Sequence, residues 1–225
     1  MFRQEGTFVS IVNRIADMVI LSVLWCVCSL PLITIGASSA ALYHTIVKVI
    51  RQDRGYAFST FTTSFRSNLK QTLAPTLLYL AIFGALSAAC LVFWEDTDSI
   101  LASSYVMLSM ILLLLSAVAF LHTFALIGRF NLSRRELFTV VSRLSFRHLF
   151  RNILLLCMLL FAMEAAIYYL PLLFILPSGF SFFGSLIQEP LFSRYIRFED
   201  DWNTDVLHRE DLPFSGKDTK QEENS

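Results

Sequence analysis

The sequence lacks the common catalytic signatures. It has no GxSxG nucleophile elbow, no phosphate-binding GxxxxGK[ST] loop, no HExxH zinc helix and no pair of carboxylates at a spacing useful for acid–base catalysis. We therefore expect a protein that is not an enzyme and needs no cofactor.

Metal and disulfide chemistry are also poorly supported. The four cysteines all lie in apolar runs without CxxC spacing: Cys26, Cys28, Cys90 and Cys157. The four histidines are scattered along the chain: His44, His122, His148 and His208. This pattern predicts no metal site, and it is typical of cysteines that serve as small packing residues. His122, near the cytoplasmic end of an apolar run, is expected to form hydrogen bonds at the membrane interface.

Apolar and aromatic residues, in contrast, are abundant. They bring the hydrophobic fraction to 55%, with 21 phenylalanines and 7 tyrosines in 225 residues. A soluble domain of this composition would expose too much apolar surface, whereas a bilayer accommodates it. We predict an all-α, polytopic membrane helical bundle over residues 1–195. Nine of the eighteen acidic residues lie between Glu199 and Glu223, so residues 196–225 are predicted to form an acidic, mostly disordered tail.

The charges alternate along the chain in a way that fixes a topology. The segment Lys48–Lys70 has five basic residues and one acidic residue, and Arg129–Arg151 has six and one. The turn between these segments contains only acidic charges, at Glu95, Asp96 and Asp98. Loops next to membrane spans retain lysine and arginine on the cytoplasmic side. Both basic segments and the C-terminal tail are therefore predicted to be cytoplasmic.

Apolar runs define the predicted spans. Four are clear: Ile15–Pro31, Thr72–Trp94, Ile100–Ile127 and Ile153–Leu170. Two are weaker: Ile33–Ile50, and Leu172–Phe192 with its prolines and glycines. Pro31 and Gly36 favour a helical hairpin, which gives six segments with both termini cytoplasmic. The alternative has five spans and an external N-terminus, with Ile33–Ile50 lying on the cytoplasmic surface.

Both basic segments have the periodicity of amphipathic helices. Within Tyr56–Lys70, apolar residues recur at helical spacing while Arg66 and Lys70 fall on another face. Within Arg134–Arg151, an apolar stripe accompanies basic residues four positions apart, at Arg143, Arg147 and Arg151. Interfacial helices of this kind bind anionic lipid headgroups. The same surfaces are candidates for contact with a cytoplasmic partner protein.

Glu164 is the main candidate for chemistry within the membrane. It lies near the middle of the predicted Ile153–Leu170 span, where a charged group is costly. A transporter would use it as a proton or cation site. The alternative is a protonated carboxyl group bonded to a nearby hydroxyl, with three candidates: Ser109, Ser116 and Thr123.

The first predicted hairpin resembles a known family. The residues that carry the resemblance are Trp25, Ser29-Leu30-Pro31, Thr34-Ile35-Gly36 and Ala41-Leu42-Tyr43, followed by Gly55-Tyr56, Phe61, Ser64-Phe65-Arg66 and Asn68-Leu69-Lys70. They resemble the YesL family of bacterial multi-pass membrane proteins over roughly residues 10–80. The resemblance implies a Gram-positive plasma-membrane protein of unassigned role, encoded near carbohydrate ABC importers. It supplies no catalytic residues.

The physical chemistry of this hairpin motif, defined as Pro31, Thr34, Gly36 and Tyr43, favours a structural role. Thr34 can bond a backbone group freed by the proline, and the small residues after Gly36 allow close helix packing. If the motif is instead a ligand site, Gly36 and Tyr43 are the residues to test.

These observations lead to one main function and two alternatives. The main one is a non-catalytic accessory subunit of a carbohydrate importer, contacting lipid headgroups and transporter subunits but no nucleic acid. The first alternative is a small transporter or channel that uses Glu164. The second is a membrane scaffold or sensor that acts through its acidic tail.

Overall fold

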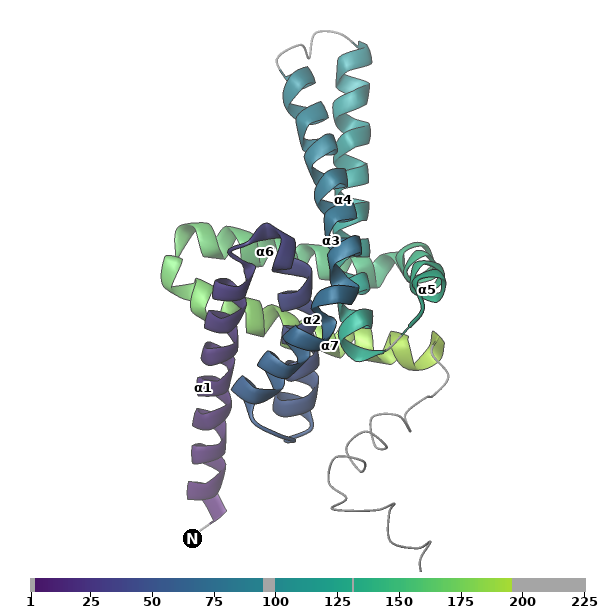
Figure 1. Cartoon of the computed structure of the whole chain (residues 1–225). Helices are drawn as coiled ribbons and strands as arrows, with labels where there is room; N and C mark the ends of the chain where they lie inside the picture. The colour runs from purple at the N-terminus through teal and green to yellow at the C-terminus, as the bar shows by residue number, and fades with distance from the viewer. Residues whose placement is uncertain (1–2, 95–99, 131, 196–225) are drawn as a thin grey trace, which may run out of the picture. The chain divides into compact units, whose positions relative to one another are not determined.

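A computed structural model describes residues 3–94, 100–130 and 132–195 (Figure 1), and these ranges contain helices and no β-strand. The predicted all-α class is therefore confirmed for them. In order, the elements are α1 (Arg3–Ser29), the 3-10 turn η1 (Leu32–Thr34), α2 (Ile35–Thr45), the π-helical turn η2 (Ile46–Arg51), α3 (Ala57–Trp94), α4 (Ile100–Arg129), α5 (Arg134–Arg147), α6 (Leu149–Tyr168), the 3-10 turn η3 (Leu170–Phe174) and α7 (Leu176–Tyr195).

The chain divides into two compact units, residues 1–189 and 190–225. The first unit contains α1 to α6 and most of α7, and it holds the contacts between helices that position the polar sites. The predicted acidic tail at 196–225 lies outside the described residues.

Several helices are compatible with a multi-pass membrane protein. Five segments of the described chain are long and apolar enough to cross a membrane: Val12–Ser29, Leu32–Arg51, Ala57–Val92, Ile100–Arg129 and Leu149–Tyr168. Helix α7, which corresponds to the predicted sixth segment, is not among them. The count of six spans stays a prediction.

The chain reverses between α1 and α2, where Pro31 and Gly36 predicted a hairpin. Thr34 Oγ1 donates to the carbonyl oxygens of Cys28 at 2.6 Å and Pro31 at 2.8 Å, so its hydroxyl satisfies acceptors at the end of α1. Across the hairpin, Ser29 and Ser38 share a hydrogen bond, and Trp25 donates to Ser39. The hairpin is therefore held by hydrogen bonds between side chains of α1 and α2 as well as by its turn.

Helix α2 is the most deeply buried element of this unit, packed among α1, α3 and α4. Its small residues allow the close approach predicted for them, since Ala37, Ala40 and Ala41 are all at most 2% exposed. Gly128 of α4 packs against the Ala40 carbonyl so closely that a Cβ on Gly128 would overlap it. Helix α2 therefore packs backbone to backbone against α4 inside this unit, and the choice between six and five spans stays a prediction.

Helix α3 differs from the prediction of a separate interfacial helix at Tyr56–Lys70. Residues 57–94 form one continuous helix of 38 residues. At about 1.5 Å per residue it is about 57 Å long, well beyond the roughly 30 Å of a hydrocarbon core. The amphipathic pattern correctly indicated a helix, but this helix does not end at Lys70 and continues without a break into the span predicted from Thr72. Pro75 lies within it, where the Thr72 and Thr76 hydroxyls donate to nearby carbonyls of the same helix.

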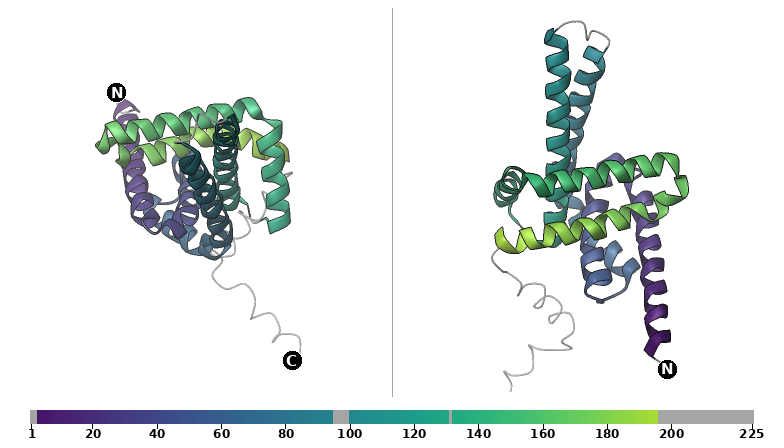
Figure 2. Two further views of the ribbon diagram at one scale, coloured as in Figure 1. Left: turned by 90° about the horizontal axis from the view of Figure 1, so that it is seen from above. Right: turned by 180° about the vertical axis from the view of Figure 1, so that it is seen from behind.

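Helices α3 and α4 run antiparallel and side by side (Figures 1 and 2). Their contact includes an aromatic cluster in which Tyr79 and Phe83 of α3 meet Phe120 and Phe124 of α4, with centroids 5.6–6.2 Å apart between the helices. Tyr79 also shares a 2.9 Å hydrogen bond with Thr123. The pair therefore has specific contacts in addition to apolar packing.

Helix α5 is a separate amphipathic helix, but it is shorter than the predicted Arg134–Arg151 segment, because the helix ends before His148 and Arg151 belongs to α6. Ser133 and Glu136 form a capping box, and the hydrogen bonds from Ser133 hold the pKa of Glu136 below its ordinary value. This contribution to stability is present above the ordinary glutamate pKa and is lost as the pH falls through the lowered value.

A buried polar network fixes the joint between α5 and α6. The Asn152 side chain donates to the Leu144 and Ser145 carbonyls, and Asn152 Oδ1 lies 2.9 Å from His122 Nε2 of α4. His122 is fully buried and forms a hydrogen bond, and its predicted position near the membrane interface stays a prediction. Beyond this joint, α6 runs antiparallel to residues 176–189 of α7, and both cross the direction of the α3–α4 pair (Figure 2).

Candidate functional site

The most distinctive polar feature is an ion pair between distant parts of the chain. Arg129, the last residue of α4, lies 3.2 Å from Glu189 of α7, measured from Nε to Oε1, and a second contact of 3.5 Å joins Nη2 to Oε2. The two side chains are only 18% and 20% exposed. In a partly buried ion pair, each charged group depends on its partner more than it would in a surface pair.

Residues from α2 and η2 complete this ionic cluster, defined as Tyr43, Arg51, Arg129, Ser185 and Glu189. The Tyr43 hydroxyl donates to Glu189 Oε1 at 3.4 Å. Arg51, which ends the π-helical turn, donates to both the carbonyl and the hydroxyl oxygen of Ser185 at 3.3 Å. Next to the cluster, His44 Nδ1 lies 2.8 Å from the Gly128 carbonyl oxygen. The cluster thereby ties α2, η2, α4 and α7 together.

The ionic cluster has a net positive charge, and its contacts join helices. It contains two guanidinium groups and one carboxylate, and each of these groups has a protein partner. The described residues contain no group of three or more His, Cys, Asp or Glu side chains that could hold a metal ion. The arrangement can join helices and can favour an anionic neighbour.

The four residues of the hairpin motif are not gathered into one site. Pro31 and Thr34 form the turn, whereas Tyr43 lies in the ionic cluster. Gly36 packs so tightly that a Cβ there would overlap both Thr76 of α3 and Phe124 of α4. Three of the four are thus explained by the turn and by packing, and Tyr43 alone enters a polar site.

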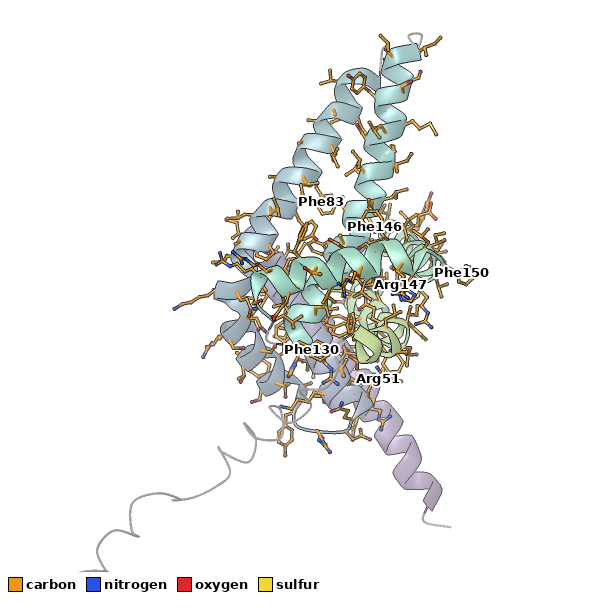
Figure 3. All side chains as sticks on the ribbon, turned by 90° about the vertical axis from the view of Figure 1, so that its right-hand side faces the viewer. Arg51, Phe83, Phe130, Phe146, Arg147 and Phe150 are labelled. Carbon is orange, nitrogen blue, oxygen red and sulfur yellow. The ribbon has the colours of Figure 1, made fainter. Side chains whose placement is uncertain are left out.

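The predicted contact residues of the basic segments lie mostly at the surface. Arg66 and Lys70 are exposed on α3, and Arg143 and Arg147 are exposed on α5. Arg151 of α6 is half-buried, and its Nη1 atom finds no hydrogen-bond partner in the described part of the chain. Figure 3 shows Phe146, Arg147 and Phe150 where α5 passes into α6, and Phe150 is 84% exposed.

Glu164 is exposed on α6, among apolar residues of the same helix that are also exposed. Two of the hydroxyls considered as its partners are otherwise engaged. Ser116 donates to Leu113, and Thr123 bonds to Ala119 and Tyr79. Glu164 is therefore directed out of the bundle and is not part of the ionic cluster.

One comparison with known proteins gives a match. Residues 18–89 match the model of a family described as "Protein of unknown function, DUF624". The matched residues cover the α1–α2 hairpin, η2 and most of α3, and so include the hairpin motif and Arg51. They cover less than half of the chain and exclude Arg129 and Glu189. No curated protein and no solved structure is detectably similar to this chain.

Sequence reasoning missed the partner of Arg129. Glu189 is the only acidic residue between Glu164 and Glu199, and it lies inside an otherwise apolar stretch. That isolation was a usable signal, because an acid retained in such a segment is usually paired. The identity of its partner, 60 positions away, leaves no local pattern in the sequence.

Proposed function

We propose that the protein is a non-catalytic, multi-pass protein of the bacterial cytoplasmic membrane that acts as the accessory partner of a membrane transport system. The observation that carries this proposal is the exposed carboxylate of Glu164 on the apolar helix α6. The exposed apolar residues of the same helix include Phe161 and Ile167, which are 72% and 77% exposed. The surface that packs against such a face should be apolar and should supply one hydrogen-bond donor to the carboxylate.

A lipid tail meets the first requirement and fails the second. An acidic side chain facing hydrocarbon costs about 2.5–3.5 kcal/mol on insertion scales, and charged groups in spans therefore tend to be paired. A neighbouring membrane protein with a basic or hydrogen-bonding side chain at the same depth would remove this cost. We infer that such a protein covers α6.

The proposed topology has six segments with the basic segments and both termini in the cytoplasm. The close packing of α2 within the bundle supports the hairpin over a surface-lying segment. Helix α7 would be the sixth segment, joined to α4 by the ionic cluster. Because α6 and α7 cross the direction of α3 and α4, this topology requires the two pairs to be tilted against each other in the bilayer. Helix α5 would lie at the cytoplasmic interface.

Helix α5 offers the second contact surface. Its exposed side presents Phe138 and Phe146 together with Arg143 and Arg147. Exposed aromatic and arginine side chains are enriched in protein interfaces. The resemblance to the YesL family and the match to the family of unknown function cover largely the same N-terminal residues. The YesL resemblance makes carbohydrate ABC importers the first partners to test.

Charge reversal on α5 tests the cytoplasmic contact. We expect the double variant Arg143→Glu, Arg147→Glu to reduce partner retention about tenfold, because like charges would then face a surface complementary to arginine. The measurement is the amount of partner that co-purifies from detergent-solubilised membranes. Arg54→Glu, an exposed charge in the loop before α3, is the control. If both variants retain as much partner as the native protein, α5 is not part of the interface.

Removal of the Glu164 charge tests the intramembrane contact. We expect Glu164→Leu to lower the affinity for the partner about thirtyfold or more, since the loss of one member of a buried charge pair costs about 2–5 kcal/mol. Cys157→Leu changes another exposed position of α6 and is the control. If Glu164 instead faces lipid, the leucine variant should be recovered in higher amounts with its partner content unchanged, and the proposed contact would be wrong.

The transporter alternative receives less support from the position of Glu164, which does not line the apolar cavity of the bundle. It predicts that Glu164→Gln abolishes pH-dependent flux in reconstituted vesicles. The scaffold or sensor alternative depends on residues 196–225, outside the described chain.

A further inference from the structure

An apolar cavity lies between the α6–α7 hairpin and the helices α1, α2 and α4. Its volume is about 420 Å³, within the range of about 300–1,000 Å³ that is typical of small-molecule sites. Leu42, Phe124, Ala162 and Phe180 are representative of its walls. An apolar space of this size is more favourably filled by hydrocarbon than by water.

One hydroxyl group in the wall has no hydrogen-bond partner among the described residues. Ser181 of α7 lines the cavity and is only 8% exposed, and its Oγ atom makes no hydrogen bond to any described residue. The neighbouring serines of the same helix differ, since Ser178 bonds to Ser22 of α1 and Ser185 accepts from Arg51. A buried hydroxyl without a partner carries a desolvation cost that a ligand acceptor would remove.

The other polar groups of the wall are few. They are Tyr43, whose hydroxyl is bonded to Glu189, Ser39, which accepts from Trp25, and Gln188. A sugar would bring a hydroxyl group on nearly every carbon, and most of these would face apolar side chains without a partner. The wall fits a molecule that is mainly hydrocarbon and has one hydrogen-bond acceptor.

We propose that this cavity binds one apolar chain of an amphiphile and that the amphiphile's ester or carboxyl oxygen accepts a hydrogen bond from Ser181. The shared chemistry is an acyl chain, which a bilayer phospholipid and a free fatty acid both supply. Neither Glu164 nor any residue of α5 lines the cavity, so lipid binding can be tested without a partner protein.

Trp25 provides the probe, because it lines the cavity. Replacing Trp94 and Trp202 with phenylalanine leaves it as the only tryptophan. The full chain is reconstituted into phosphatidylglycerol vesicles, and quenching of Trp25 is measured with either dibrominated phosphatidylglycerol or dibrominated stearic acid. The cavity is closed with Ala162→Phe, and Ala85→Phe, at an exposed position of α3, is the control.

We expect quenching to fall in Ala162→Phe and to be unchanged in Ala85→Phe. Quenching lost only with the brominated phospholipid identifies a bilayer lipid as the ligand, and loss with the fatty acid identifies a free amphiphile; both support the proposal. Equal quenching in all proteins with both probes would overturn it.

A conservative variant keeps the test valid if Ala162→Phe does not fold. Ser181→Ala should weaken binding of the brominated fatty acid or phospholipid about fivefold, the value of one ordinary hydrogen bond. Ser104→Ala, whose hydroxyl donates to its own helix at Ile100, should leave binding unchanged. The same affinity in both serine variants would contradict the role given to Ser181.

Discussion

Replacing Glu189 with leucine is expected to lower the free energy of unfolding by about 2 kcal/mol, between the values typical of exposed and of fully buried ion pairs. The change leaves Arg129 largely buried without its carboxylate, and it removes the acceptor of the Tyr43 hydroxyl. The measurement is the loss of helical circular dichroism during titration with sodium dodecyl sulfate in mixed micelles. The double variant Arg129→Met, Glu189→Leu should recover part of the loss, because no unpaired charge remains.

The exposed ion pair between Arg14 of α1 and Asp53 is the matched control for this effect. Its side chains are 46% and 66% exposed, so Asp53→Asn should change stability by less than about 1 kcal/mol. Asparagine suits the positive φ of 53° at this position, which avoids added backbone strain. If Glu189→Leu has no greater effect than Asp53→Asn, the Arg129–Glu189 pair does not clamp α4 to α7.

Two glycines should respond in opposite directions to the same substitution. Gly128→Ala is expected to destabilise the protein by about 1–3 kcal/mol, because the new Cβ would overlap the Ala40 carbonyl, a backbone atom that cannot rotate away. Gly84→Ala in α3 meets no atom within 4 Å and should stabilise the helix by about 0.5–1 kcal/mol.

The same detergent titration compares the two variants. If both variants change the free energy of unfolding in the same direction, helix propensity determines the effect of Gly128→Ala, and the close contact between α2 and α4 does not.

The parts of the fold that depend on local chemistry were predictable. Pro31 and Gly36 predicted the first hairpin, and Thr34, three residues after the proline, bonds backbone carbonyls at the turn. The small residues of α2 pack closely, as their size allows. In each case the cause lies within a few residues of its effect.

The features that were missed depend on contacts between distant residues. The end of an amphipathic helix needs a breaking residue, and periodicity alone did not show that residues 57–70 continue into α3. The burial of His122 depends on Asn152, thirty positions later. Similarly, the outward direction of Glu164 depends on which face of α6 meets the bundle, and an almost uniformly apolar helix gives no such information.

Each part of the proposed function has a different physical basis. Glu164 calls for a donor that lipid tails cannot supply, and α5 offers arginine and phenylalanine side chains outside the bundle. The family match covers neither feature, since it ends at residue 89. The proposed contact with a partner therefore lies in the second half of the chain, outside the hairpin region that matches the family.

Purification of the native protein from its own membrane in mild detergent, with mass spectrometry of the bound proteins, tests the central proposal most directly. The account predicts transporter membrane subunits in near-equal amounts to this protein, and their loss in the Glu164→Leu variant. Recovery of the protein alone, as a defined monomer or homo-oligomer, would contradict the accessory role.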